Sequence, residues 1–224
     1  SPDLPRLRFS TLARFFDDVR DADWPLPVVH DELQHHASGC YAAHSGIKRW
    51  NRRAEHALLR AEAWAAVAAR VTGLAYPTEA FARAWKDVLF NQFHDILAGT
   101  SLAEAYDDAR DLYSEAMTIA DRALNDAVQS LAWSMHVPHA PDTKPLVVFN
   151  PHAWERRAAV EMEMGRIPEG CVLVDDDGTP VPHQRVQSHA TAWGRVRIAF
   201  TASLPPLGYR VYHLKTEGLD AVPD

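Results

Sequence analysis

The pattern of apolar positions between residues 47 and 131 is helical. In its first part, apolar or small side chains recur close to one face of a helix; they are Ile47, Trp50, Ala54, Leu58, Ala61, Ala65 and Ala68. Gly73 follows where a C-terminal cap is expected, so a helix is predicted over about residues 47–71. A shorter helix is predicted near residues 10–20, and Pro25 and Pro27 prevent its continuation. We expect this first segment to dock onto another surface.

Two further helices are predicted along the same pattern. With Thr78 as its N-cap, the second runs through EAFARAWKDVLFNQFHDILA and stops at Gly99. Ser101 and Glu104 have the spacing of a capping box, which marks the start of the third helix. The seam of that helix is rich in alanine, which lets neighbouring helices approach closely: Leu102, Ala105, Ala109, Leu112, Ala116, Ala120, Ala123, Ala127 and Leu131. Three long amphipathic helices with short connections predict an antiparallel three-helix bundle.

From about residue 144 the pattern changes to short runs, several of them alternating, separated by Pro, Gly and Asp clusters. The runs are PLVVFNP, AAVEMEM, CVLVDDDGTPVPHQRV, RVRIAFTASL and YRVYHL. Asp177-Gly178 predicts a tight hairpin turn, and residues 136–145 are interpreted as a linker. The region holds about seven strands at most and shows no evident closure, so a partial antiparallel β-sandwich with open edges is predicted. The expected fold class is an α+β, multi-domain chain.

Composition narrows the classes of function. A chain of 224 residues with 47% hydrophobic and 24% charged residues can bury a core, and its formal charge of −7 argues against nucleic acid as a partner. No run is long enough for a membrane span, and the first residues lack the layout of a secretory signal. We therefore expect a cytoplasmic protein without a membrane partner. Cys40 and Cys171 match no metal or redox spacing and are expected to be reduced.

The adjacent residues His94 and Asp95 are the candidates for chemistry. On a helical wheel His94 falls roughly opposite the apolar face, so periodicity alone favours an ordinary solvated surface; that face comprises Trp85, Val88, Leu89, Phe93, Ile96 and Leu97, and Asp87 and Asn91 lie nearer to His94. A neutral imidazole is also a preferred zinc ligand, and the adjacent carboxylate can bind sugar hydroxyls. A catalytic zinc needs about three protein ligands, so these two residues do not make a complete site.

The segment NQFHDILAGTS, preceded by WKDVL, resembles the His-Asp motif of glycoside hydrolase family 38, the α-mannosidases. The stretch HDELQHHASGCYAAHSGIKRWNRRAEHALLRAE resembles the lead into the helical middle domain of that family, and LVVFNPHAWERRAAV and PPLGYRVYHL resemble the opening strands of its β domain. The resemblance covers essentially the whole chain. It implies three regions: the tail of a catalytic α/β domain over residues 1–38, the helical middle domain over 39–138, and the first part of the β-sandwich domain over 145–224.

The resemblance also implies that His94 is a zinc ligand and that Asp95 contacts hydroxyls of the mannose. The family keeps a zinc-binding His-x-Asp pair and a nucleophilic Asp in its catalytic domain, and none of the twelve histidines here begins a His-x-Asp. We therefore expect one part of a zinc-dependent retaining α-mannosidase, inactive alone and binding zinc weakly. Its expected partners are an α-mannoside, the missing catalytic domain, the rest of the β domain and, through exposed surfaces, further copies of itself.

Two alternatives remain open. One is a relative in the same family that hydrolyses a mannosyl conjugate such as mannosylglycerate; the other is a module that binds carbohydrate or serves in assembly without hydrolysis.

The remaining motifs are interpreted structurally. HDELQHH, residues 30–36, is predicted to be a surface or interdomain segment with Glu32 at an interface. The basic residues around Lys48 are expected on a solvated or interdomain helix face, Asp175–Gly178 in a hairpin rather than a calcium loop, and three aromatic residues in the core: Trp154, Trp193 and Tyr209.

Overall fold

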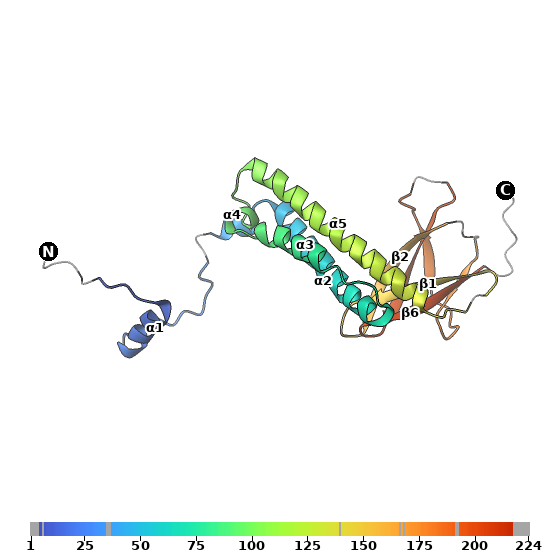
Figure 1. The fold of residues 1–224 in the computed structure, drawn as a ribbon, viewed down its shortest axis with the longest axis horizontal. Helices are drawn as coiled ribbons and strands as arrows, with labels where there is room; N and C mark the ends of the chain where they lie inside the picture. The colour runs from blue at the N-terminus through green and yellow to red at the C-terminus, as the bar shows by residue number, and fades with distance from the viewer. Residues whose placement is uncertain are drawn as a thin grey trace. The chain divides into compact units, whose positions relative to one another are not determined.

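The computed structural model describes residues 5, 7–34, 37–138, 140–165, 167, 169–190 and 193–216, which form two units, Ser1–Tyr41 and Ala42–Asp224 (Figure 1). The first unit contains helix α1, Leu12–Asp21, and a short 3-10 helix, Ser38–Tyr41. Thr11 caps α1 by accepting a hydrogen bond from the backbone N–H of Arg14, and no residue of α1 is buried. The predicted short helix is confirmed. His35 and His36 of the HDELQHH motif lie outside the described residues.

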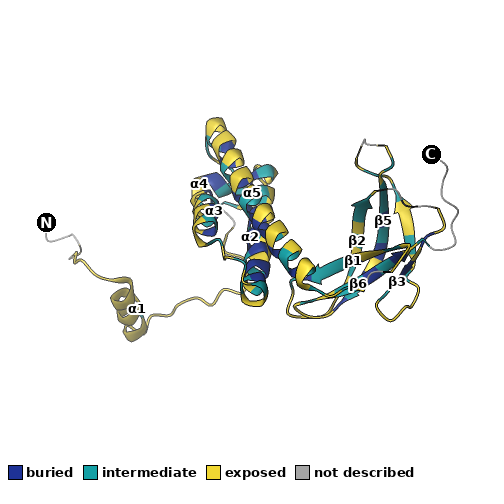
Figure 2. Ribbon diagram, turned by 45° about the vertical axis from the view of Figure 1, so that its right-hand side comes forward, coloured by how far each residue is buried: buried dark blue, intermediate teal, exposed yellow. Residues whose placement is uncertain are grey.

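The second unit begins with four helices: α2 (Ser45–Thr72), α3 (Thr78–Phe90), α4 (His94–Leu97) and α5 (Ala103–Ser134). The three long helices share one apolar core, visible as the buried faces that α2, α3 and α5 turn toward one another (Figure 2). Gly73 ends α2 with φ of +77°, as its position in the sequence predicts. On α5 the core is mostly alanine, but Tyr106 and Tyr113 are buried in it, whereas the predicted seam residue Leu102 is 75% exposed.

The second predicted helix is wrong in one respect, because it breaks after Phe90 and restarts at His94. The Asn91 side chain donates a hydrogen bond to the carbonyl of Asp87 at 2.8 Å, a local bond that competes with continued helix. The break also invalidates the helical wheel across it: Leu89 and Phe93 are 58% and 53% exposed, while Asn91 is buried. Residue Thr78 is the first helical residue and not the N-cap.

The predicted capping box at the start of α5 does not form. Leu102 occupies the N-cap position, and no side chain bonds to the first turn. The backbone N–H of Ser101 instead donates to the hydroxyl of Tyr106 at 2.9 Å. Because the Tyr106 hydroxyl satisfies the Ser101 amide, the Glu104 side chain, which would accept from that amide in a capping box, is not needed for it.

Six strands follow in the described residues, arranged as two antiparallel sheets with the orders β1-β6-β3 and β2-β5-β4. Their bounds are Thr143–Asn150, Arg156–Met164, Val172–Val174, His183–Val186, Val196–Leu204 and Gly208–Lys215 for β1 to β6. The inward residues of both sheets form a single second core, among them Leu173, Ile198 and Tyr212. The change of pattern from helix to strand near residue 144 is confirmed. No helix in the described part of the chain is long and apolar enough to cross a bilayer.

Two expectations for this region have different outcomes. The turn at Asp177-Gly178 is confirmed, since the Asp175 carboxylate accepts hydrogen bonds from the N–H groups of Asp177 and Thr179 at 3.1 and 2.8 Å. The aromatic residues expected in the core are instead exposed, Trp154 by 57%, Trp193 by 84% and Tyr209 by 45%. The two tryptophans lie in connections between strands, where no inward face exists, and Tyr209 lies on the outward side of β6. Both cysteines are free thiols, as predicted.

Acid is expected to loosen the loop after β4. The Glu163 carboxylate accepts hydrogen bonds from the Ser188 hydroxyl and from the N–H groups of His189 and Ala190, and these bonds, with nearby Arg197, lower the pKa of Glu163 from 4.5. The stabilisation is therefore present above pH 4.5 and is lost as the pH falls through the folded pKa. In an NMR titration, the chemical shifts of the His189 and Ala190 amides should change with a midpoint at the pKa of Glu163, which lies below 4.5. Glu163→Gln should abolish the shift; an identical titration in that variant would contradict the assignment.

Candidate functional site

His94 and Asp95 form the first turn of α4 and lie beside each other at the surface. His94 Nε2 is 3.6 Å from Asp95 Oδ2, and the two side chains are 79% and 58% exposed. The ring of Phe93 lies 4.3 Å from the imidazole, centroid to centroid. Among the described residues, no group of three metal-binding side chains includes either residue. The pair is thus open to solvent and available to a ligand or to another protein surface.

The backbone that carries the pair is held by Lys48 of α2. Its amino group donates hydrogen bonds to the carbonyl oxygens of Ala43, Leu97 and Ala98, at 2.5, 3.2 and 3.3 Å. The last two carbonyls lie at the C-terminal end of α4, where helical carbonyls lack partners and a positive charge is favourable. Lys48 therefore joins the start of α2 to the end of α4, whereas the sequence analysis placed it on a solvated or interdomain helix face.

The segment after α4 packs closely against the residues that precede α2. Gly99 has φ of +86°, and a Cβ at this position would lie 2.7 Å from the carbonyl oxygen of Ala43. Only glycine combines this conformation with this approach. Next to the contact, the His44 ring stacks on Tyr106 of α5 with centroids 4.0 Å apart, and His44 Nδ1 accepts a hydrogen bond from Ile47 N. The residues before α2, the first turn of α5 and the segment after α4 therefore lie in contact with one another.

A second set of polar contacts holds the turn before α4. The Gln92 amide donates to Asn51 Oδ1 at 3.1 Å and to Glu55 Oε1 at 2.8 Å. Asn51 also accepts a hydrogen bond from the Tyr113 hydroxyl at 3.1 Å, and burial, together with the charge of Glu55, raises the pKa of Tyr113 well above its usual range. Because Tyr113 keeps its proton, it remains a donor. Gln92, to which the sequence assigned no role, therefore links the turn to α2 and α5.

One sequence signal could have indicated this network. Asn51 interrupts the apolar stripe of α2 between Ile47 and Ala54, and it is 6% exposed. A buried polar side chain in such a stripe requires hydrogen-bond partners. The sequence could not say which residues supply them, because Gln92 and Tyr113 belong to other helices.

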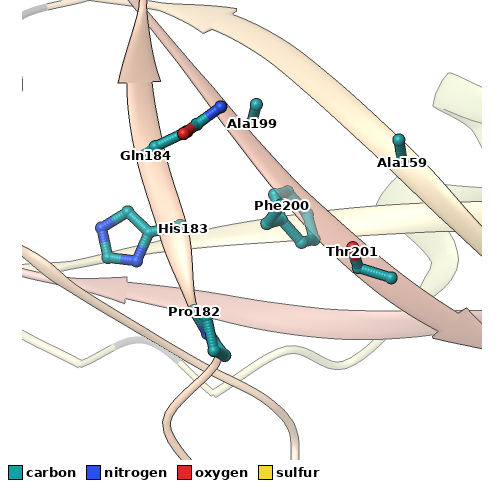
Figure 3. A pocket seen from close by; sticks show the side chains of 7 residues that line it. All are labelled: Ala159, Pro182, His183, Gln184, Ala199, Phe200 and Thr201. Carbon is teal, nitrogen blue, oxygen red and sulfur yellow. The ribbon is translucent and has the colours of Figure 1, made fainter.

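The β region contains a separate hollow between strands β4, β5 and β2 (Figure 3). Its lining includes Ala159, Gln184, Ala199 and Thr201. Among the described residues of this lining, the only titratable side chain is His183, whose Nε2 is 3.9 Å from the Cys171 sulfur. Burial raises the pKa of that thiol, which keeps it protonated and unreactive. The described lining therefore offers a single acid–base group, His183, and no carboxylate to act with it.

Comparison with known proteins relates this architecture to the α-mannosidases. Residues 35–131 match the family described as the alpha mannosidase middle domain. Alpha-mannosidase 2C1 of Mus musculus is 26% identical over 170 residues, covering 75% of this chain and 15% of that protein. The epididymis-specific alpha-mannosidase of Sus scrofa is 26% identical over 225 residues, covering 93% and 22%. A glycosyl hydrolase family 38 structure from Enterococcus faecalis has a TM-score of 0.71 at 20% identity, covering 96% of this chain and 29% of that one.

These findings confirm the resemblance seen in the sequence: residues 35–131 match the alpha mannosidase middle domain family, and most of the chain is similar to one part of curated α-mannosidases. The matched structure also confirms the order of a helical domain followed by antiparallel sheets. The chain spans only 15% and 22% of the mouse and pig relatives.

Proposed function

We propose that this chain works within a zinc-dependent retaining α-mannosidase that hydrolyses terminal α-mannosyl residues, with His94 and Asp95 as its contribution to the active site. The observation that supports this is that the two side chains are exposed to solvent, while the backbone that carries them is held in place by hydrogen bonds. The side chains are 79% and 58% exposed, whereas their helix is held by Lys48 and follows a turn held by Gln92. A binding group on a supported backbone is suited to a site completed by another domain.

The donor set fits one part of a zinc site. His94 offers an exposed imidazole with a carboxylate beside it, and a catalytic zinc takes about three protein ligands. His94 would hold the ion together with ligands from the catalytic domain, and a bound zinc would stabilise charge and orient sugar hydroxyls. Asp95, as a carboxylate, would accept hydrogen bonds from the mannose hydroxyls. The nucleophile and the acid/base would both lie outside this chain.

The domain assignment belongs to the same proposal. Residues 1–38 would be the end of the catalytic domain, 39–138 a three-helix middle domain, and 145–224 the first part of a β-sandwich. Helix α1, none of whose residues is buried, supports the first assignment, because Leu12, Phe15 and Phe16 are 79%, 55% and 60% exposed and need a covering surface. The cores shared by the three long helices and by the two sheets support the other two.

The test is the activity of the longer polypeptide in which this chain would work. His94→Ala should lower kcat/KM for an aryl α-mannoside by at least about 100-fold and reduce the bound zinc measured by mass spectrometry. Asp95→Asn should lower activity while zinc is retained. The matched control is His56→Ala, because His56 is an exposed histidine on α2, and its activity should stay at the wild-type level.

Three outcomes would count against the proposal. Near-normal activity and zinc content in His94→Ala would show that His94 is not a ligand. Hydrolysis of mannosylglycerate without activity on aryl α-mannosides would favour the related conjugate hydrolase. Binding of α-mannosides by the longer polypeptide without any turnover would favour a carbohydrate-binding module.

A further inference from the structure

Among the described residues the two sheets have four edge strands, and three of these strands carry features that hinder further pairing. Strands β3 and β4 are only three and four residues long. Strand β1 contains Lys144 and Pro145, and the proline has no N–H to donate. Strand β2 is nine residues long and contains neither proline nor lysine. It is therefore the edge best suited to accept another strand.

One side of β2 lacks a partner. All nine residues of β2 pair with β5, and no other segment of the described chain forms a backbone hydrogen bond with it. No residue of β2 is buried (Figure 2). On its core side Val160 and Met162 are only partly buried, whereas the β5 residues opposite them, Phe200 and Ile198, are 5% and 0% exposed. A further strand on this side would cover apolar surface as well as backbone groups.

The charges of β2 are divided between its two ends. Arg156 and Arg157 begin the strand, and Glu161 and Glu163 lie near its end. An antiparallel copy of the same strand would place each basic end beside an acidic end, whereas a parallel copy would place like charges together. The Glu161 carboxylate is 54% exposed, so it is open to a second cation besides Arg197, from which it lies 3.1 Å away.

From these features we propose that β2 pairs with β2 of a second copy of this chain, antiparallel and centred on Val160. The three-stranded sheets of the two copies then join into one continuous sheet. On the core side, Val160 faces its own counterpart and Ala158 faces Met162, so apolar side chains meet across the interface. This interface belongs to the β region and uses no residue of α4 or of its supports, so the inference does not depend on the proposed mannosidase function.

The charges favour this register over its neighbours. Centred on Val160, the pairing uses all nine residues of β2 and sets Arg157 opposite Glu163. If the centre moved one residue toward the start of the strand, Glu155 of one copy would face Glu163 of the other. If it moved one residue toward the end, the two Glu161 side chains would face each other. Like charges directly opposite are destabilising in a sheet, so one register is selected.

The experiment is sedimentation equilibrium of the chain at concentrations up to about 1 mM, because an interface of two strands is small and the dimer should be weak. Ala159 is exposed and faces Glu161 of the other copy, so Ala159→Lys and Ala159→Glu test the sign of an added charge. The dimer Kd should fall about threefold for Ala159→Lys and rise about threefold for Ala159→Glu, since two such pairs form in each dimer. Ala66→Lys and Ala66→Glu, at an exposed position of α2, are the matched controls and should leave the Kd unchanged.

Hydrogen exchange of the wild-type chain tests the same interface without a substitution. The β2 amides that point away from β5 should exchange slowly only at concentrations at which the dimer forms. Absence of this protection would overturn the proposal even if a variant failed to fold.

Three further results would overturn it. The first is a chain that stays monomeric over the whole concentration range. The second is a dimer with equal Kd for Ala159→Lys and Ala159→Glu, which would indicate association through another surface, such as the exposed apolar side chains of α1. The third is a monomeric longer polypeptide in which the same amides are protected at every concentration, because a strand of that polypeptide would then occupy the edge. None of these measurements uses mannosidase activity, so a failure of the proposed function is distinguished from a failure of the interface.

Discussion

Trp64→Ala should destabilise the second unit by about 3–5 kcal/mol, because it removes a large aromatic side chain from a close-packed core. Trp64 is 5% exposed, and its ring meets that of Phe149 edge to face with centroids 5.0 Å apart. This contact joins the helical core to β1, and the truncation also widens an adjoining cavity of about 460 Å³. For a chain of this size the melting temperature should fall by about 6–20 °C, as measured by circular dichroism.

The control is Trp133→Ala in the same chain. Trp133 is 81% exposed on α5, so its removal should change the free energy of unfolding by no more than about 0.5 kcal/mol. Equal melting temperatures for the two variants would show that Trp64 does not connect the helical and β regions as the contact with Phe149 indicates.

Gly99→Ala is expected to have the second largest effect, about 2–5 kcal/mol in the free energy of unfolding. A left-handed backbone costs an L-residue about 1–2 kcal/mol, and Gly99 has φ of +86°. The added methyl would also lie 2.7 Å from the Ala43 carbonyl oxygen, and such overpacking typically costs about 1–3 kcal/mol. Urea denaturation measures the sum.

Gly73→Ala separates the two contributions. Gly73 has φ of +77°, but a Cβ at this position would meet no atom of the described residues within 4 Å, so this variant should show only the backbone cost of about 1–2 kcal/mol. The difference between the two variants then measures how tightly the segment after α4 packs against the residues before α2. If both variants lose the same stability, that close contact is absent in solution and the support proposed for His94 fails.

Much of the fold follows from local pattern. The helical repeat of small residues predicted α2 and α5, because burying one face of a helix requires apolar side chains three and four positions apart. Gly73 marked the end of α2 because the left-handed conformation of a helix C-cap favours glycine, and this preference depends on that residue alone. The strands after residue 144 were indicated by alternation and turn residues, and the Asp177-Gly178 turn is closed by the side chain of Asp175, only two positions away.

The elements that were predicted wrongly depend on contacts between distant residues. The break between α3 and α4 places Gln92 against Asn51, 41 positions away in the sequence. The end of α4 is held by Lys48 across 49 positions, and the Ser101 amide is satisfied by a tyrosine rather than by a capping box. A helical wheel treats the chain as one uninterrupted helix and cannot anticipate these competing bonds.

The sequence by itself determined a resemblance to the family 38 α-mannosidases, since the His94-Asp95 motif, the helical middle segment and the strand motifs occur in the order of that family, and the comparisons confirm that resemblance. Only the tertiary structure decided how the pair is presented, with exposed side chains on a backbone held by α2 and preceded by a turn linked to α5. The physical reason is that motif and periodicity are properties of neighbouring residues. The support of a surface site depends on hydrogen bonds between residues that only folding brings together.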